Sequence, residues 1–263
     1  MKVVILCGGQ GLRIREVEEG IPKAMIKVGD KPILEHIMDI YSSFGYKEFI
    51  LCLGYKGNLI KDYFVNYYNH NKDFTINMQN NHIEYHTSDL ENDYKITFVE
   101  TGKYSNTATR LKYVMKYLNN DENFMLTYAD GLANINLKEL VKYHYSHGKI
   151  LTISGVKPMG RFGAIKFDAK GRIIEFNEKK EDQFSMVSGG YFVCNSNIID
   201  YLDSETMLEE GTFTKLVREK QMMVYEHEGF WQPMDTYKDY ILLNEMIEKG
   251  RNEWLTKSIV KSY

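Results

Sequence analysis

The 263 residues of this chain can bury one substantial core, and we expect a single domain over residues 1–263. Hydrophobic residues make up 43% and charged residues 26%, a balance that excludes disordered and fibrous classes. The net charge of -3 is spread along the chain and gives no basic field, so no nucleic-acid partner is expected.

The cysteines and the apolar runs bear on localisation. Cys7, Cys52 and Cys194 each lie in or at the end of a strand-like run, where a free thiol packs as a small hydrophobe. This usage favours a reducing cytoplasm. No stretch approaches the roughly eighteen apolar residues of a membrane span, and Val3–Cys7 is too short for a signal-peptide core. We therefore expect neither export nor a membrane partner.

Apolar runs rich in β-branched or aromatic residues recur along the chain and predict strands. They lie at Val3–Leu6, Phe49–Leu53, Ile96–Val99, Phe124–Thr127, Leu151–Val156 and Tyr191–Cys194. Apolar residues recur at helical spacing after Pro32, after Gly57 and over Tyr237–Lys249, which predicts a helix in each place. Gly250 stands where a C-cap glycine of the last helix is expected. The alternation predicts an α/β fold, a doubly wound and mostly parallel sheet with helices on both faces.

Residues 69–93 interrupt this rhythm. They are rich in Asn, His and Asp and hold only short apolar pieces, so we expect a small hairpin excursion. Just before it, Tyr63, Phe64, Tyr67 and Tyr68 recur at helical spacing, which favours core or subunit contacts over a platform for base stacking.

The first predicted strand runs directly into Gly8-Gly9-Gln10-Gly11, with Arg13 just beyond. Such a loop exposes backbone N–H groups without Cβ obstruction, which suits phosphate binding at the carboxyl end of a strand. The third glycine of G-x-G-x-x-G is absent, and no G-K-[ST] follows, which counts against dinucleotide dehydrogenases and P-loop enzymes. The loop predicts a nucleotide ligand, with a plain structural turn as the alternative.

Further segments carry a family resemblance. Pro22-Lys23-Ala24-Met25 and Gly29–Leu34 follow a loop of the form x-G-G-x-G-x-R, and matching segments continue at Gly54–Gly57, Val99–Gly102, Arg110–Lys112, Tyr128–Gly131, Gly160–Ala164, Glu178-Lys179 and Gly229–Thr236. Over nearly the whole chain these segments resemble sugar-1-phosphate nucleotidyltransferases. The last two sets look most like the glucose-1-phosphate cytidylyltransferase branch.

This resemblance implies a Rossmann-like nucleotidyltransferase fold and a Mg²⁺-dependent cytidylyltransferase. Such an enzyme joins CTP and a phosphate monoester, foremost glucose 1-phosphate, into a CDP-linked product and pyrophosphate. The reaction needs charge neutralisation and in-line positioning rather than covalent help from the protein. The resemblance also implies a homo-oligomer that makes precursors of a surface polysaccharide such as capsule or O-antigen.

The resemblance assigns the site residues as well. Arg13 and Lys23 would be catalytic, placing positive charge on the α-phosphate and the leaving pyrophosphate. The nucleotide would be bound by Leu6, Cys7, Gly8, Gly9, Gln10, Gly11, Leu12, Arg13, Lys23, Ser105, Arg110 and Ala129. Arg110 and Lys179 would hold the acceptor phosphate, and Asp130 and Asp235 the Mg²⁺.

Each of these side chains has a simpler interpretation. Lys23 could be a solvated loop lysine, Arg110 and Lys179 solvated charges, and Asp130 a turn residue. Asp235 could cap the terminal helix. His144 and His147 are three residues apart on a predicted helix, but without a third ligand they do not predict a zinc site.

The chain departs from the family pattern near the acceptor site. Ala108-Thr109 stand where the family usually has two glycines, and Ala129 stands where it usually has one. Lys180 replaces a proline. Leu12, in the glycine loop, replaces a threonine whose hydroxyl would be a hydrogen-bond donor. The side chains added at Ala108-Thr109 and at Ala129 predict a narrower acceptor pocket, and the hydroxyl missing at Leu12 predicts modestly weaker binding of the triphosphate.

Two other functions therefore stay open. The first is the same chemistry with a different acceptor, such as glycerol phosphate or another phosphorylated sugar. The second is a catalytically silent nucleotide-sugar-binding module, against which the retained charged residues argue.

Overall fold

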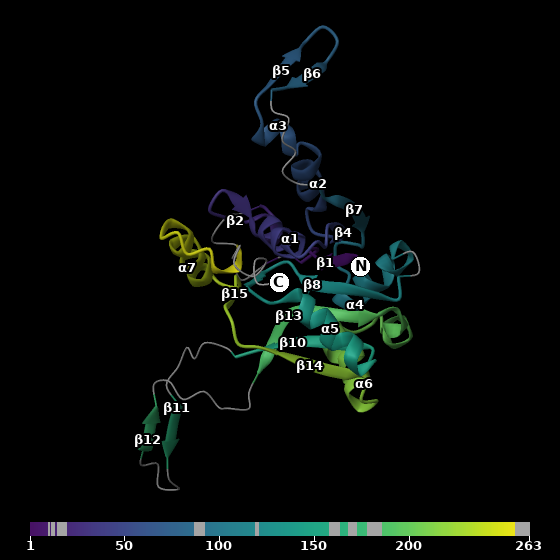
Figure 1. Ribbon diagram of the computed structural model, residues 1–263, viewed down its shortest axis with the longest axis vertical. Coiled ribbons are helices and arrows are strands. Elements are labelled where there is room, and N and C mark those ends of the chain that lie inside the picture. Colours follow the sequence, from purple (N-terminus) through teal and green to yellow (C-terminus); the bar gives the residue numbers. More distant parts are fainter. Residues whose placement is uncertain are drawn as a thin grey trace.

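A seven-stranded sheet forms the centre of the molecule, with strand order β14-β10-β13-β8-β1-β4-β7 (Figure 1). The strands are β1 (Val3–Leu6), β4 (Glu48–Leu53), β7 (Lys95–Glu100), β8 (Asn123–Tyr128), β10 (Leu151–Val156), β13 (Val187–Asn195) and β14 (Met222–His227). The computed structural model describes residues 1–9, 11, 14, 20–86, 93–118, 121–157 and 186–254, and the backbone alone of 164–167, 173–177 and 255.

Strand directions confirm a mostly parallel sheet. β8, β1, β4 and β7 run parallel, as do β10 and β14. β13 is the exception, because it lies antiparallel to both β8 and β10. Every predicted run is a strand of this sheet, but β14 was not predicted. It is an edge strand of alternating partial burial, so it lacks the continuous apolar run of the central strands.

Alternate residues of the strands build two cores, one on each face of the sheet. Val3 and Ile5 of β1 join one cluster, packed by α1 (Ile33–Ser43), α2 (Gly57–Val65), α5 (Leu137–His147) and α7 (Tyr237–Glu248). Val4 and Leu6 join the other, packed by α4 (Thr107–Val114) and α6 (Phe213–Arg218). The period of two along each strand thus produces the predicted doubly wound fold.

The start of α7 settles which residue caps it. Thr236 is the N-cap, and its Oγ1 accepts a hydrogen bond from the backbone N–H of Asp239. The carboxylate of Asp239 in turn accepts from the N–H of Thr236, which completes a capping box. The cap is therefore the residue after Asp235, and the alternative role of Asp235 as a helix cap is wrong.

Residues 67–85 form an arm that projects from the body (Figure 1). It consists of α3 (Tyr67–Asn71) and the antiparallel hairpin β5 (Phe74–Asn77) and β6 (His82–Tyr85), which confirms the predicted excursion. The arm is fixed at its base by Glu35 of α1, buried to 1% exposure, which accepts hydrogen bonds from the hydroxyls of Tyr63 and Tyr67. These aromatic side chains thus anchor the arm to the body.

Three further pairs of short strands complete the fold. They are β2 (Lys27–Val28) with β3 (Lys31–Pro32), β9 (Gly131–Ala133) with β15 (Trp231–Pro233), and β11 (Ala164–Phe167) with β12 (Ile173–Asn177). In the part of the chain that the structure describes, no helix has the length and apolar character that crossing a membrane requires.

Candidate active site

A pocket of about 960 Å³ opens at the carboxyl ends of β1 and β8. Because β13 is antiparallel, its first residues lie at this same edge and form the opposite wall. Each predicted site residue that the structure describes lines this pocket: Leu6, Cys7, Gly8, Gly9, Gly11, Lys23, Ser105, Arg110, Ala129, Asp130 and Asp235. Gln10, Leu12, Arg13 and Lys179 lie outside the described residues.

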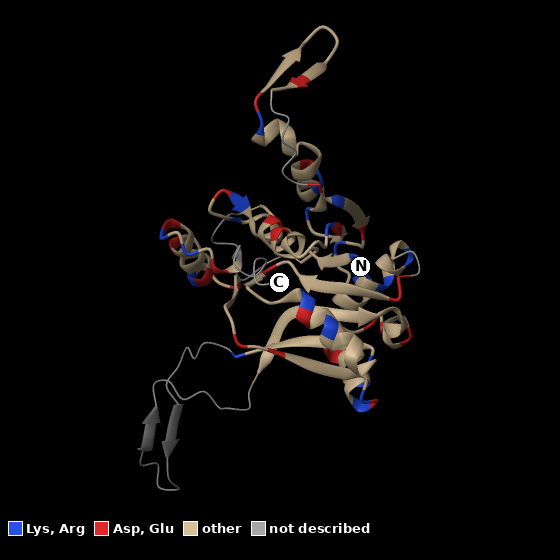
Figure 2. Ribbon diagram, viewed as in Figure 1, with Lys and Arg blue, Asp and Glu red and all other residues tan. Residues whose placement is uncertain are grey.

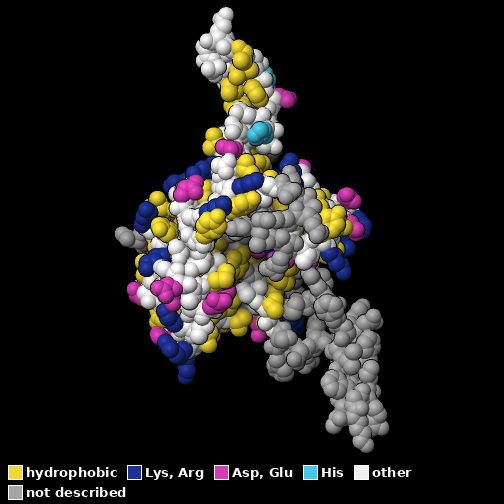
Figure 3. Space-filling view, turned by 180° about the vertical axis from the view of Figure 1, so that it is seen from behind, with side chains coloured by type: hydrophobic (Ala, Val, Ile, Leu, Met, Phe, Trp, Pro, Cys, Tyr) yellow, Lys and Arg dark blue, Asp and Glu magenta, His cyan; other side chains and the backbone are white. Residues whose placement is uncertain are grey.

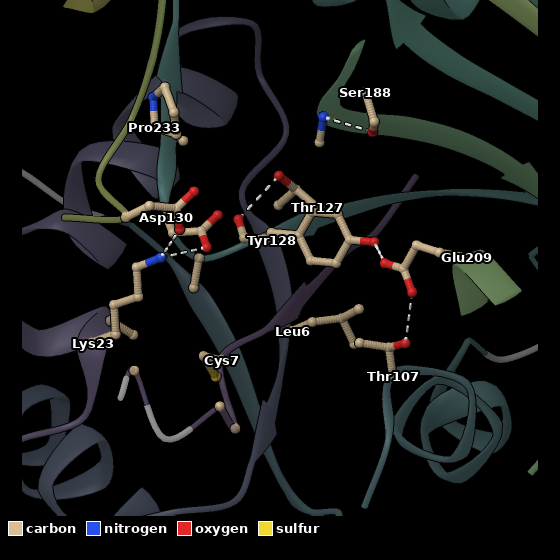
Figure 4. A pocket seen from close by; sticks show the side chains of 18 of the residues that line it. Leu6, Cys7, Lys23, Thr107, Thr127, Tyr128, Asp130, Ser188, Glu209 and Pro233 are labelled. Carbon is tan, nitrogen blue, oxygen red and sulfur yellow. Dashed lines mark hydrogen bonds and ion pairs between the residues drawn. The ribbon is translucent and has the colours of Figure 1, made fainter. Parts of the chain in front are cut away.

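Lys23 connects the two predicted metal ligands (Figure 4). It sits in a 3₁₀ turn over Lys23–Met25, and its Nζ lies 2.8 Å from Asp130 Oδ2 and 2.7 Å from Asp235 Oδ1. Its side chain is 16% exposed, so Lys23 is not the solvated loop lysine of the alternative interpretation. The lysine and both carboxylates converge on one point of the pocket wall.

The ladder between β9 and β15 brings the carboxylates together. Gly131 of β9 pairs with Pro233 of β15, and the N–H of Met234 donates to the carbonyl of Asp130 at 2.8 Å. Asp130 directly precedes β9, and Asp235 follows β15 after one residue, Met234. Their proximity is therefore fixed by backbone hydrogen bonds between segments far apart in the chain.

The charge of Lys23 follows from these neighbours. Burial alone would lower the pKa of its ammonium, but the charges and hydrogen bonds of Asp130 and Asp235 outweigh burial and raise the pKa. Lys23 is therefore a permanent cation at neutral pH, held in place by two charge-assisted hydrogen bonds.

The carboxylates suit a magnesium ion. Mg²⁺ prefers oxygen ligands and is usually held by one or two carboxylates together with substrate phosphates. Asp130 and Asp235 supply such oxygens at one point, with side chains 35% and 38% exposed to the pocket. Among the described residues, no group of three or more His, Cys, Asp or Glu forms a fuller metal site.

The glycine loop leaves β1 beside Lys23. Gly11 has a φ of +58°, and a Cβ there would lie 2.8 Å from Cβ of Lys23, so glycine permits both the turn and the close approach. Among the described residues, no atom lies within 4 Å of the position that a Cβ on Gly9 would occupy. Burial raises the pKa of the Cys7 thiol to about 12, so this thiol packs as a hydrophobe and is not a nucleophile.

The side chains expected to narrow the acceptor pocket mostly point elsewhere. Ala108 is 0% exposed within the core beneath α4, and Thr109 donates its hydroxyl to the carbonyl of Ser204 at 2.9 Å. Neither lines the pocket, whereas Ala129 does. The prediction of narrowing by Ala108 and Thr109 is wrong, because the first turn of α4 directs one into the core and the other to a neighbouring loop.

Several pocket residues were not predicted as site residues. Tyr128, at the end of β8, donates its hydroxyl to Glu209, which also accepts from Thr107 at 3.3 Å (Figure 4). Trp231 donates from Nε1 to the carbonyl of Gly189 at 2.9 Å. The sequence did contain a signal for Gly189-Gly190 as pocket residues, because two glycines stand beside an apolar run there, as they do in the first glycine loop. Glu209, in a single π-helical turn over Leu208–Thr212, offered none.

The pocket combines a glycine-rich loop and a fixed cation with carboxylates suited to a divalent metal, at the edge of an open α/β sheet where ligands bind. Fold and site together define an α/β enzyme that acts on phosphate groups. The model of the nucleotidyl transferase family matches residues 2–250, and the chain belongs to this family. It is therefore a nucleotidyltransferase.

Two relatives and one solved structure illustrate the similarity. The chain is 44% identical to glucose-1-phosphate cytidylyltransferase of Salmonella typhi, over 97% of this chain and 99% of that protein. It is 41% identical to a probable glucose-1-phosphate cytidylyltransferase of Bacillus subtilis (strain 168), with the same coverage. The crystal structure of HddC from Yersinia pseudotuberculosis matches with a TM-score of 0.66 at 21% identity, over 94% of this chain and 99% of that one, which supports the fold.

Proposed function

We propose that this enzyme transfers a cytidylyl group from CTP to glucose 1-phosphate, forming CDP-glucose and pyrophosphate. An oxygen of the sugar phosphate attacks the α-phosphorus of CTP, and the bond to the β-phosphate oxygen breaks, so that pyrophosphate leaves with the electron pair. The observation that carries the proposal is the placement of Lys23 between Asp130 and Asp235 beside the glycine loop. The 44% identity to the Salmonella typhi enzyme supports CTP and glucose 1-phosphate as substrates.

The chain's own residues bind and orient the reacting groups. Backbone N–H groups of the loop from Leu6 to Arg13 receive the triphosphate, and Gly9 leaves room for it. The ammonium of Lys23 stabilises the charge that develops on the phosphate oxygens. Arg13 adds charge at the leaving pyrophosphate, and Lys179 holds the acceptor phosphate.

Asp130 and Asp235 hold a Mg²⁺ ion in this proposal. When bound, the ion neutralises charge on the phosphate oxygens and helps to align them. The supporting observation is that both carboxylates already direct an oxygen at one cation, the Lys23 ammonium.

We favour glucose 1-phosphate over a smaller acceptor in this proposal for a structural reason. The alternative of glycerol phosphate or another phosphorylated sugar rested on a pocket narrowed by Ala108, Thr109 and Ala129, and of these three residues Ala129 alone lines the pocket. The silent-module alternative is disfavoured by the convergence of Lys23 with both carboxylates, since nucleotide binding alone does not require it.

Pyrophosphate release tests the proposal directly. Each of the four ribonucleoside triphosphates is combined with glucose 1-phosphate, glycerol 3-phosphate or mannose 1-phosphate, with and without Mg²⁺. We expect rapid release only with CTP, glucose 1-phosphate and Mg²⁺. Release with another triphosphate or only with glycerol 3-phosphate would refute the substrate assignment, and no release with any pair would favour a silent module.

We also propose that the enzyme is a homo-oligomer in which the arm contacts a second copy. Ile76, Met78 and Tyr85 on the arm are 43%, 78% and 40% exposed. Charged residues in 67–86 are confined to Lys72, Asp73 and Glu84, and hydrophobic side chains follow the arm (Figures 2 and 3). A lone two-stranded hairpin is marginally stable in water, so contact with another subunit would stabilise it.

Sedimentation velocity tests the oligomer. The double change Ile76→Glu and Met78→Glu should shift the enzyme toward the monomer, because it places charges in the apolar contact. Gln79→Glu on the same arm is the matched control and should leave the assembly intact. A wild-type monomer at micromolar concentration would contradict the proposal.

We further propose that residues 1–263 act as one nucleotidyltransferase domain in the cytoplasm. A single sheet that takes strands from both halves of the chain supports the domain assignment. Cys7, Cys52 and Cys194 are buried free thiols, which supports a reducing compartment. Its CDP-linked product would serve surface polysaccharide synthesis, and loss of that product from cells lacking the enzyme would be the test.

A further inference from the structure

Asp239 is a buried acidic residue to which the proposed mechanism gives no part. It lies in the first turn of α7 and is 2% exposed. Its Oδ2 accepts hydrogen bonds from the backbone N–H of Asp235 at 3.2 Å and of Thr236 at 2.9 Å, and from the Thr236 hydroxyl at 2.8 Å. Its Oδ1 accepts from Nε2 of Gln232 at 3.1 Å. Both oxygens are thus engaged within the protein, and Asp239 does not line the pocket.

The helix cap accounts for only part of this arrangement. A capping box consists of the reciprocal bonds between Thr236 and Asp239. The bonds that Asp239 accepts from Asp235 and Gln232 are additional to the box. Gln232 is 5% exposed and also donates from Nε2 to the carbonyl of Pro233 at 2.9 Å, so its amide connects the last residue of β15 to the first turn of α7. The additional bonds therefore hold the segment between these two elements.

This segment carries one of the carboxylates at the pocket. Three residues join β15 to α7 (Figure 1): Met234, Asp235 and Thr236. The N–H of Met234 donates to the carbonyl of Asp130, and the next two N–H groups donate to Asp239. Each backbone N–H of the segment therefore has a fixed acceptor. The carboxylate of Asp235 lies on the pocket side, where its Oδ1 meets Nζ of Lys23 at 2.7 Å.

We propose that Asp239 is a positioning residue for the Mg²⁺ site: by holding the backbone N–H of Asp235, it fixes the direction in which the Asp235 carboxylate meets the metal. Groups that orient a metal ligand typically contribute about ten- to hundredfold to metal affinity. Gln232 acts through Asp239, because it holds the other carboxylate oxygen. The inference rests on the proposed function in taking Asp235 as a ligand of Mg²⁺.

Asp239→Asn is the principal test, because it keeps the side-chain shape but replaces one acceptor oxygen by a donor. In one orientation of the amide its Nδ2 faces Nε2 of Gln232, and in the other it faces the N–H groups of Asp235 and Thr236. Mg²⁺ is titrated by calorimetry without substrates, and the free Mg²⁺ that gives half-maximal pyrophosphate release is measured at saturating CTP and glucose 1-phosphate.

Both Mg²⁺ constants should rise about ten- to hundredfold in Asp239→Asn. Saturating Mg²⁺ should restore most of the turnover, because the ligands themselves are intact. KM for glucose 1-phosphate should change less than about twofold, since the acceptor does not contact the altered segment in the proposed mechanism.

Thr236→Ala is the matched control. It removes the hydroxyl that caps α7 but keeps the bonds from Asp235 and Gln232 to Asp239. It should lower the Tm by roughly 2–4 °C and leave both Mg²⁺ constants unchanged. Gln232→Met keeps the length of the side chain and should weaken Mg²⁺ binding by about tenfold, the effect of losing one hydrogen bond to a charged group. This second variant keeps the proposal testable if Asp239→Asn does not fold.

The proposal fails in any of three cases. If Asp239→Asn lowers the Tm as Thr236→Ala does but leaves both Mg²⁺ constants unchanged, Asp239 is a helix cap and nothing more. If Thr236→Ala weakens Mg²⁺ binding as much as Asp239→Asn, general destabilisation explains the effect. A wild type that binds no Mg²⁺ and releases no pyrophosphate would overturn the proposed function together with this inference, whereas a normal wild type with unchanged Asp239→Asn and Gln232→Met variants would overturn this inference alone.

Discussion

Replacing Lys23 by methionine removes the ammonium but keeps most of the apolar stem. Nζ of Lys23 is held by two carboxylates, at 2.8 Å from Asp130 and 2.7 Å from Asp235, so its position is set before substrate binds. Loss of one such preorganised donor typically costs about 3 kcal/mol of transition-state stabilisation. We therefore expect turnover in Lys23→Met to fall by roughly a hundredfold or more.

The effect of this change on stability should be much smaller. The Lys23 side chain is 16% exposed, but its partners Asp130 and Asp235 are 35% and 38% exposed and remain partly hydrated. Such pairs lie near surface salt bridges in strength, so their loss should cost about 1 kcal/mol of unfolding free energy. For a chain of this length that corresponds to roughly 2–4 °C in Tm.

Steady-state pyrophosphate release and thermal unfolding would be measured on the same preparations. Lys27→Met, an exposed lysine on the neighbouring β2, is the matched control and should retain both turnover and Tm. Wild-type turnover in a folded Lys23→Met enzyme would refute the role of Lys23. A Tm loss far above a few degrees would show that the ion pairs act mainly in folding.

Three further predictions follow from the described residues. Asp130→Asn and Asp235→Asn should lower Mg²⁺ affinity and turnover together, and a variant with wild-type Mg²⁺ binding by calorimetry would contradict the metal assignment. Ala108→Gly with Thr109→Gly should leave the kcat/KM ratio of glucose 1-phosphate to glycerol 3-phosphate unchanged while lowering the unfolding free energy by roughly 1 kcal/mol per glycine in α4, and a shifted ratio would show that these side chains reach the acceptor. Burial and the charge of a neighbouring histidine lower the pKa of His144 to about 4, so stability should decline as the pH falls from about 6.5 toward 4, because the unfolded chain takes up the proton first. A Tm profile of His144→Gln over this range that matches the wild type would contradict the last prediction.

The sequence by itself determined the strands that carry the pocket. Runs such as Val3–Leu6 and Phe124–Leu126 are apolar at every position, as expected for a strand buried on both faces. The glycines shortly after β1 likewise indicated the loop that borders the pocket, because glycine's backbone freedom is a local property that the sequence shows directly. β14 was not predicted, because an edge strand is only partly buried and therefore lacks a continuous apolar run.

The tertiary structure decided how distant segments meet. Lys23 contacts carboxylates 107 and 212 residues away along the chain, and the β9–β15 ladder that joins them leaves no periodic pattern in the sequence. Arg110 illustrates the same limit of sequence-based prediction, because the sequence of an amphipathic helix does not show which hydrogen-bond acceptors a charged side chain on it will contact. Its guanidinium is committed to strand ends that become neighbours only when β1, β4 and β7 pair. Local periodicity thus determines the elements, and only the pairing of strands and burial of side chains between them determines which charges share a site.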